Sequence, residues 1–313
     1  MANRILRIGT RGSLLALTQS QWVKEAIERQ WQGCQVELKI IKTTGDKILD
    51  VPLAKVGGKG LFVKELEDAL LDGSVDLAVH SMKDVPAVLP KGLEIGAIPK
   101  REDPRDVLIT REGEDLSILP PGARVGTSSL RRAAQIRSLR PDLEIENLRG
   151  NLDTRLRKVQ EGRYEAIVLA AAGMHRMGWK DRITAYLDPT QFLPAIGQGA
   201  LGIEIRTDDG AIRERLAPLH DPETAVAVRA ERSLLKELEG GCQVPVAGYA
   251  RVLEGRIVEL SGLVASLDGK QIYRRTRSAP CNEAESLGRG LARELLDGGA
   301  RRILQEIYRS AST

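Results

Sequence analysis

Apolar and polar positions alternate along the first 220 residues in a pattern that predicts strands and helices in turn. In the first part, we expect strands over 5–10, 35–41 and 75–80 and helices over 13–30 and 62–73. From Arg124 the pattern begins again, with strands expected over 143–148 and 164–173 and helices over 130–139 and 152–162. Such alternation predicts α/β lobes with doubly wound, mostly parallel sheets covered on both faces.

The order of the segments predicts three units. The chain is expected to cross between lobes at residues 101–106 and to return at 193–206, where Gly197 and Gly199 are either hinges or ordinary turn residues. Beyond Asp221, three strand-like segments adjoin one another, and they predict a small antiparallel sheet with a helix over 222–240 and a last helix over 284–309. The expected units are a first lobe (1–100 and 198–219), a second lobe (105–195) and a C-terminal domain (221–313).

The composition indicates a globular protein without a membrane span. Hydrophobic residues make up 42% and charged residues 29%, and the apolar stretch at the N-terminus is too short for a signal peptide, so we expect a cytoplasmic protein. Three scattered cysteines argue against a disulfide framework, and three scattered histidines lack any metal-ligand spacing. We therefore expect neither disulfides nor a metal site.

The positive charge is concentrated in one segment. Residues 126–163 contain nine Lys or Arg and five Asp or Glu, a difference that equals the whole net charge of +4. A local positive field favours an anionic partner. With aromatic residues at only 3% and no nucleic-acid reading motif, small polycarboxylates or phosphates fit better than nucleic acid.

Two turns of similar sequence lead from a strand into a helix. One runs from Gly9 through Thr10 and Arg11 to Ser13, and the other runs over residues 126–129. Helix N-termini attract anions, so two lobes facing a cleft would direct both turns at one ligand. Ser13 and Ser129 could equally be simple helix caps.

Three polar residues follow the apolar strand over 75–80. Ser81, Lys83 and Asp84 stand at the strand end where open α/β sheets bind ligands. Lys83 could bind an anion and Asp84 could stabilise a cation, although Asp84 could instead order the turn before Val85.

Four arginines at expected sheet and helix ends form a plausible polycarboxylate cradle: Arg131, Arg132, Arg149 and Arg155. A solvated basic face is the alternative, above all for Arg137, Arg140, Arg157 and Lys158. The Gly57–Gly60 segment lacks phosphate-loop spacing and fits a flap over the cleft, with Phe62 either covering the site or packing in the core.

Cys242 follows Gly240 and Gly241 at the end of a predicted helix. A lone thiol is usually an inert small apolar residue, but this one is expected on a loop. No histidine lies nearby in the sequence to suggest a protease dyad, so an attachment point is the functional alternative.

Taken together, these motifs resemble the porphobilinogen deaminase (hydroxymethylbilane synthase) family. The matching stretches, in family order, are GTRGSLLAL, PLAKVGGKGLFVKELE, DLAVHSMKDVP, REDPRD, VGTSSLRR, LRGNLDTRL, LPAIGQGALGIE and LEGGCQVPV. The resemblance implies two lobes like type II periplasmic binding proteins, a small C-terminal α/β domain, and a monomeric transferase of haem biosynthesis. It also implies a dipyrromethane cofactor joined to Cys242 by a thioether.

The family reaction condenses four porphobilinogen molecules onto that primer with loss of ammonia, and water then releases hydroxymethylbilane. The resemblance makes Asp84 catalytic and implies cofactor binding by Ser81, Lys83, Asp84, Thr127, Ser128, Ser129, Arg131, Arg132, Arg149, Gly150, Ala170 and Gly173. It implies substrate binding by Arg11, Ser13, Gln19, Arg149, Arg155, Arg176 and Gln198, and a flap carrying Lys55, Lys59 and Phe62. From the composition we expect no nucleic-acid or membrane partner, although a nucleic-acid binder, favoured only by the basic segment, stays open as a third option. A non-catalytic, two-lobed anion-binding module is the alternative.

Overall fold

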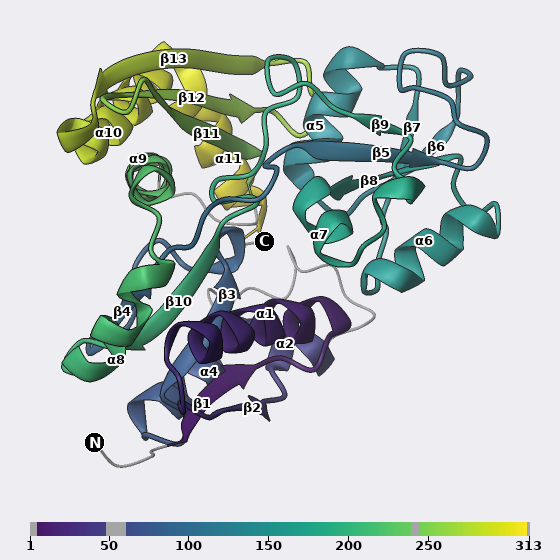
Figure 1. Ribbon diagram of the computed structural model, residues 1–313. Helices are drawn as coiled ribbons and strands as arrows, with labels where there is room; N and C mark the ends of the chain where they lie inside the picture. Colours follow the sequence, from purple (N-terminus) through teal and green to yellow (C-terminus); the bar gives the residue numbers. More distant parts are fainter. Residues whose placement is uncertain (1–4, 48–60, 239–243, 312–313) are drawn as a thin grey trace.

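The computed structural model describes residues 5–47, 61–238 and 244–311, which form two α/β lobes and a third domain (Figure 1). The sheet of the first lobe consists, in spatial order, of β2 (Val36–Ile40), β1 (Leu6–Thr10), β3 (Leu77–Ser81), β10 (Leu201–Arg206) and β4 (Leu93–Ala97). The sheet of the second lobe consists of β7 (Glu144–Glu146), β6 (Arg124–Gly126), β8 (Ala166–Ala170), β5 (Asp106–Thr110) and β9 (Ala185–Tyr186).

The first lobe has one antiparallel strand in an otherwise parallel sheet. Strand β1 pairs in parallel with β2 and β3, whereas β10 is antiparallel to both β3 and β4. Helices α1 (Leu14–Gln30) and α8 (Gly210–Leu216) share a core with one face, and α4 (Lys64–Leu71) packs on the side of Ala78. The expected α/β lobe is confirmed, with helices on both faces.

The second lobe repeats this arrangement. Strand β5 is the antiparallel member, bonded to β8 and β9, while β6 is parallel to β7 and β8. Helix α5 (Leu130–Leu139) shares one core with the sheet, and α6 (Leu152–Gln160) and α7 (Ala171–Arg176) share another. The expected strand over 164–173 is wrong in its second half, because the backbone turns into α7 directly after Ala170.

The two antiparallel strands, β5 and β10, are those that follow the crossings between the lobes. The crossings lie side by side, with the Glu102 amide donating to the Gly199 carbonyl at 3.2 Å. Gly199 has φ +88, and a Cβ there would lie 2.3 Å from the Glu102 carbonyl oxygen. Glycine is therefore required here, because a side chain would collide with this oxygen and because other residues rarely adopt a positive φ. The exact domain boundaries and the hinge role stay predictions.

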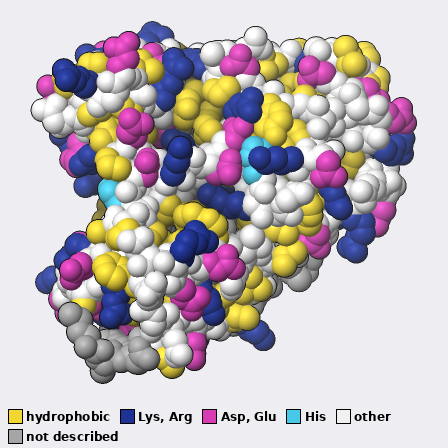
Figure 2. All heavy atoms as spheres, in the orientation of Figure 1, with side chains coloured by type: hydrophobic (Ala, Val, Ile, Leu, Met, Phe, Trp, Pro, Cys, Tyr) yellow, Lys and Arg dark blue, Asp and Glu magenta, His cyan; other side chains and the backbone are white. Residues whose placement is uncertain are grey.

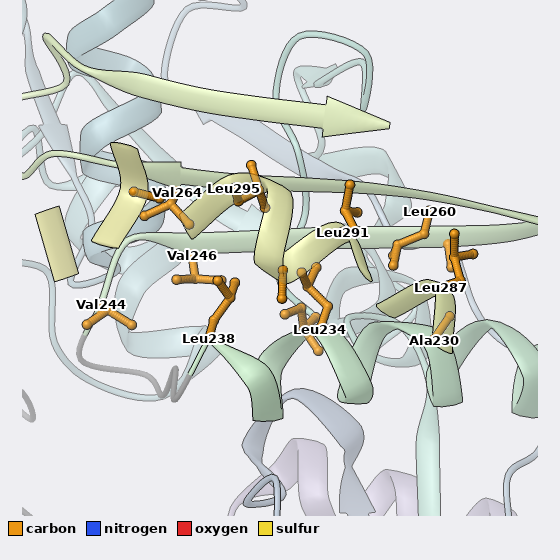
Figure 3. Packing of buried hydrophobic residues seen from close by; sticks show 14 of the residues in the cluster. Ala230, Leu234, Leu238, Val244, Val246, Leu260, Val264, Leu287, Leu291 and Leu295 are labelled. Atoms are coloured by element: carbon orange, nitrogen blue, oxygen red, sulfur yellow. The ribbon is translucent and has the colours of Figure 1, made fainter. Parts of the chain in front are cut away.

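The third domain is an antiparallel sheet covered by helices. Strand β12 (Ile257–Ala265) lies between β11 (Val246–Leu253) and β13 (Ile272–Pro280), and the predicted small antiparallel sheet is confirmed. Helix α9 (Pro222–Glu237) packs with α10 (Ala284–Leu295) and the sheet around a core that includes Leu234 and Leu291 (Figure 3).

The single last helix expected over 284–309 is wrong. Helix α10 ends at Leu295, a wide turn spans Leu296–Ala300, and α11 (Arg301–Ala311) follows. Gly299 has φ +121, which breaks the helix, and a Cβ there would lie 2.4 Å from the Tyr273 hydroxyl oxygen. The remaining short elements are α2 (Thr44–Lys47) and the turns Met82–Asp84, Lys180–Arg182, Ala217–Leu219 and Cys281–Glu283.

No described helix is long and apolar enough to cross a membrane. Within the same residues, no group of His, Cys, Asp or Glu could hold a metal ion.

Candidate active site

A pocket opens between the two lobes, with an empty volume of about 890 Å³ up to its open mouth. Figure 2 shows Lys and Arg side chains gathered near the centre of the visible face, where the lobes meet. The predicted residues that line the pocket are Arg11, Ser13, Gln19, Phe62, Ser81, Lys83, Asp84, Arg132, Arg155, Ala170, Gly173, Arg176 and Gln198.

Lys83 and Asp84 lie on a short 3-10 turn directly after β3. Backbone bonds order this turn: the Met82 amide donates to the Ala200 carbonyl, and the Val85 amide donates to the Met82 carbonyl. No side-chain hydrogen bond of Asp84 is found among the described residues, which argues against a turn-ordering role. Its carboxylate is left to face the pocket and its cations.

Burial lowers the pKa of the Lys83 ammonium, while the neighbouring Asp84 carboxylate acts in the opposite direction. Asp84 also acts to raise the pKa of Arg155 from the second lobe. Its negative charge therefore lies among cations contributed by both lobes.

The serines at both helix starts are caps. Ser13 accepts from the Ala16 amide of α1, and Ser129 accepts from the Arg132 amide of α5, each at 3.4 Å. Thr127 accepts from the Ser129 amide, and the Ser128 hydroxyl donates to the Leu148 carbonyl. Ser13 also lines the pocket, whereas the 127–129 turn is not part of its lining.

Arg131 and Arg132 both pair with Asp106, the first residue of β5. The Asp106 carboxylate is fully buried and accepts from Arg131 Nη1 at 2.7 Å and from Arg132 Nη2 at 2.7 Å. Burial alone raises the pKa of Asp106, but the two guanidinium groups outweigh it and bring the pKa to about 2. The anion that the first turn of α5 requires is thus supplied by the protein.

Sequence reasoning misses this carboxylate, because the pattern places Asp106 only within the expected crossing at residues 101–106. The signal that could have found it is the pair of arginines in the first turn of a helix, which demands a nearby anion. Arg132 still lines the pocket, and cofactor binding by Arg131 and Arg132 stays a prediction.

Arg155 and Arg176 are half-buried and make no hydrogen bond to a carboxylate among the described residues. Arg155 Nε donates to the Gly150 carbonyl at 2.8 Å, and Arg176 Nη2 donates to the Gly199 carbonyl at 2.7 Å. Burial lowers the pKa of each guanidinium to about 10. These cations keep donor groups for an anion that enters the pocket.

Arg149 and Gly150 lie at the junction between β7 and α6, outside the pocket lining. The Arg149 carbonyl accepts from Lys158 Nζ at 3.0 Å, and Gly150 has φ +114. Binding of cofactor or substrate by these two residues stays a prediction.

Gln198 places an amide in the pocket from the return crossing. Its side chain is 1% exposed, and its Nε2 donates to the Pro104 carbonyl at 2.7 Å and to Asp106 Oδ1 at 3.1 Å. These bonds fix the orientation of the amide, and its buried Oε1 has no partner among the described residues. A ligand N–H would satisfy this oxygen, and pyrrole rings carry such a donor.

Phe62 lies in the turn before α4 rather than in the helix expected over 62–73, and it lines the pocket. The Arg11 guanidinium lies 4.2 Å from the centre of its ring. Lys55, Lys59 and Cys242 lie outside the described residues.

Two family models match the chain. Residues 6–214 match "Porphobilinogen deaminase, dipyromethane cofactor binding domain", and residues 225–297 match "Porphobilinogen deaminase, C-terminal domain". This chain belongs to the porphobilinogen deaminase family. The resemblance drawn from the motifs is confirmed.

Curated relatives agree over nearly the whole length. The porphobilinogen deaminase of Syntrophobacter fumaroxidans is 68% identical over 99% of this chain and 100% of the relative. That of Syntrophotalea carbinolica is 58% identical over 97% of this chain and 96% of the relative. Among solved structures, the periplasmic VFT2 domain of Bordetella pertussis BvgS aligns at a TM-score of 0.41 and 15% identity, over 68% of this chain and 85% of that domain. The two five-stranded sheets of this porphobilinogen deaminase family member show its two-lobed fold.

Proposed function

We propose that the pocket between the lobes is where this transferase of the porphobilinogen deaminase family condenses four porphobilinogen molecules onto a dipyrromethane primer. Each addition releases ammonia, and hydrolysis then liberates hydroxymethylbilane. One observation carries this assignment: the lining holds five cationic side chains, Arg11, Lys83, Arg132, Arg155 and Arg176, around a single described carboxylate, Asp84. Porphobilinogen has the complementary charges, two carboxylates and one aminomethyl group.

The residues of the pocket fit a dipyrromethane. When bound, this group supplies the pyrrole carbon that forms the new carbon–carbon bond. Lys83 and Arg132 line the pocket beside Asp84 and would hold its carboxylates. The unpartnered Gln198 Oε1 would accept from a ring N–H. We propose Cys242 as its covalent attachment, with Thr127, Ser128, Ser129, Arg131, Arg149 and Gly150 supporting the site, and Ser81, Ala170 and Gly173 lining it.

Asp84 is the proposed catalytic residue. Loss of ammonia from porphobilinogen leaves a cationic carbon, and a fixed carboxylate stabilises such a charge in a site shielded from water. The same carboxylate can receive the proton released as the new bond forms. Because Asp84 is not engaged by a hydrogen bond from the described residues, its oxygens remain available for these steps.

The remaining cations are proposed to bind the incoming substrate. Arg155 and Arg176 reach the pocket from the second lobe, and Arg11, Ser13 and Gln19 reach it from the first. Binding from both sides would orient the aminomethyl group toward Asp84. Phe62 covers the Arg11 side chain, and we propose that Lys55 and Lys59 act with it as a flap.

Intact mass tests the attachment, and substrate consumption tests the reaction. We expect purified protein to exceed its polypeptide mass by one dipyrromethane, and Cys242→Ser to lose that excess together with turnover. Protein of bare polypeptide mass that binds porphobilinogen without consuming it would instead support an anion-binding module.

We further propose a cytoplasmic monomer. Cys34 and Cys281 are free thiols in the structure, which suits a reducing compartment. Sedimentation of the purified chain tests the monomer, and fractionation of cells tests the compartment.

A further inference from the structure

A guanidinium from the third domain holds the loop directly after the Asp84 turn. Arg232 of α9 donates from Nη2 to the Pro86 carbonyl at 2.7 Å, with longer bonds of 3.3 Å from Nη1 to Val85 and from Nη2 to Ala87. Three successive carbonyls therefore accept from one side chain. A planar guanidinium can do this because it presents several donors in a rigid fork.

An apolar contact supports the same junction one helical turn earlier. Val228 of α9 is fully buried in a cluster with Met82 and Val85, the residues that flank Lys83 and Asp84. Val228 and Arg232 are four residues apart, so they lie on the same face of the helix. This face of α9 therefore contacts the Asp84 turn by packing and by hydrogen bonds.

The other side of α9 is fixed in the third domain. Ala230, Leu234 and Leu238 point into the core formed with β11, β12 and α10 (Figure 3). Helix α9 ends at Glu237, and Cys242 is the fifth residue beyond that end. A rigid helix thus connects the Asp84 turn to the start of the segment that carries the attachment cysteine.

Within the described residues, the Arg232 guanidinium makes no hydrogen bond to a carboxylate. Burial lowers its pKa, and the nearby Glu204 carboxylate acts in the opposite direction. The described hydrogen bonds of this half-buried guanidinium all go to backbone carbonyls. Stability alone would not require it, because desolvating the charge costs free energy and an apolar side chain could fill the same space. Its geometry serves to fix the course of residues 85–87.

We propose that Arg232 is a positioning residue, which holds the Asp84 turn at a fixed place relative to the helix that leads to Cys242. This inference rests on the proposed function, in which Asp84 acts on a chain attached at Cys242. A displacement of about 1 Å of a reacting group can cost about 100-fold in rate. The loss of Arg232 should therefore lower turnover beyond any effect on folding.

The test compares Arg232→Met with Arg229→Met, because Arg229 is an exposed arginine on the same helix. We expect Arg232→Met to lower kcat for porphobilinogen at least about 10-fold with KM nearly unchanged, and Arg229→Met to match wild type. Arg232→Lys retains one donor group and should recover part of kcat. Intact mass identifies the fraction of each sample that carries the cofactor, and rates are expressed per loaded protein.

Amide hydrogen exchange provides a readout independent of activity. Arg232→Met should accelerate exchange in the peptide that spans residues 82–89, while peptides of the core of the third domain keep their protection. If Arg232→Met folds, exchanges and turns over like wild type, the inference is wrong. If it only lowers the melting temperature while kcat of the loaded protein is unchanged, Arg232 is structural.

Should Arg232→Met fail to fold, Arg232→Lys and Arg232→Gln decide the matter by the same exchange and kcat measurements. The proposed function fails separately, if the wild-type protein binds porphobilinogen without consuming it.

Discussion

Two groups of arginines in this molecule differ in the acceptors that their guanidinium groups bind. Arg131 and Arg132 share the buried Asp106, whereas Arg155 and Arg176 have only carbonyl acceptors among the described hydrogen bonds. The first group shares one internal carboxylate, which offsets one of its two positive charges and links α5 to β5. The second group is half-buried, and an incoming carboxylate would offset the cost of that partial burial. The same residue type thus builds structure in one place and prepares binding in the other.

Removal of the Asp106 carboxylate is expected to have the largest effect. Asp106→Asn leaves two buried guanidinium groups without a charge partner and should lower the free energy of unfolding by about 3 to 5 kcal/mol. Asp142→Asn removes the partner of Arg140 in an exposed pair and should cost less than about 1 kcal/mol. Urea unfolding measures both, and equal losses would contradict the distinction.

The ion pairs of Asp106 also predict a loss of stability in acid. Because the folded pKa of Asp106 is about 2, below the usual carboxyl value of 3.8, its contribution to stability is present above the unfolded pKa. The contribution is lost as pH falls toward 2. Asp106→Asn should therefore destabilise the protein less at pH 2 than at pH 6, as urea unfolding at the two values would show.

The Asp84 carboxylate, which lines the pocket with its cations, should matter for rate rather than for stability. Asp84→Asn is expected to reduce kcat by about 100- to 1,000-fold, the range for loss of one fixed electrostatic group. The melting temperature should change little, because the Asp84 side chain orders no described turn. Porphobilinogen consumption together with calorimetry measures both effects. A wild-type rate would remove Asp84 from the proposed mechanism.

Replacement of a binding arginine should change KM more than stability, and replacement of a structural arginine should do the reverse. Arg176→Met is expected to raise KM for porphobilinogen about 10-fold, because one charge-assisted contact contributes about 1.5 to 3 kcal/mol. Its stability should change far less than that of Arg131→Met, which leaves Asp106 with fewer donors. Parallel steady-state kinetics and urea unfolding compare the two variants. Larger destabilisation by Arg176→Met would reverse the assignment.

The smallest effect concerns an acid in the core of the first lobe. Burial, with help from Glu204, raises the pKa of Glu67 from 4.5 to about 7. The folded state then holds more protons than the unfolded state between these values, so stability falls as pH rises from 4.5 to 7. Glu67→Gln should gain melting temperature over wild type as pH rises through that interval, whereas Asp68→Asn at an exposed position should not. A pH-independent difference would contradict the raised pKa.

Local patterns predicted most elements because their causes are local. The apolar spacing over 14–30 and 130–139 and the caps Ser13 and Ser129 specify α1 and α5 within the chain itself. The pattern missed β5, since its apolar run of three residues, 107–109, does not distinguish a buried strand from other buried segments. It also missed the break at Gly299, where contact with Tyr273 and a positive φ stop the helix.

The sequence by itself determined the lobes, the concentration of positive charge and the family, since these reside in periodicity, composition and motif order. Tertiary structure decided which arginines have an internal carboxylate partner, because Asp106 reaches Arg131 and Arg132 only when β5 lies beside β8. It also brought Arg232 to the carbonyls of Val85 and Pro86, across 147 and 146 positions of the chain. Pairings at such separations depend on the fold, and no local pattern encodes them.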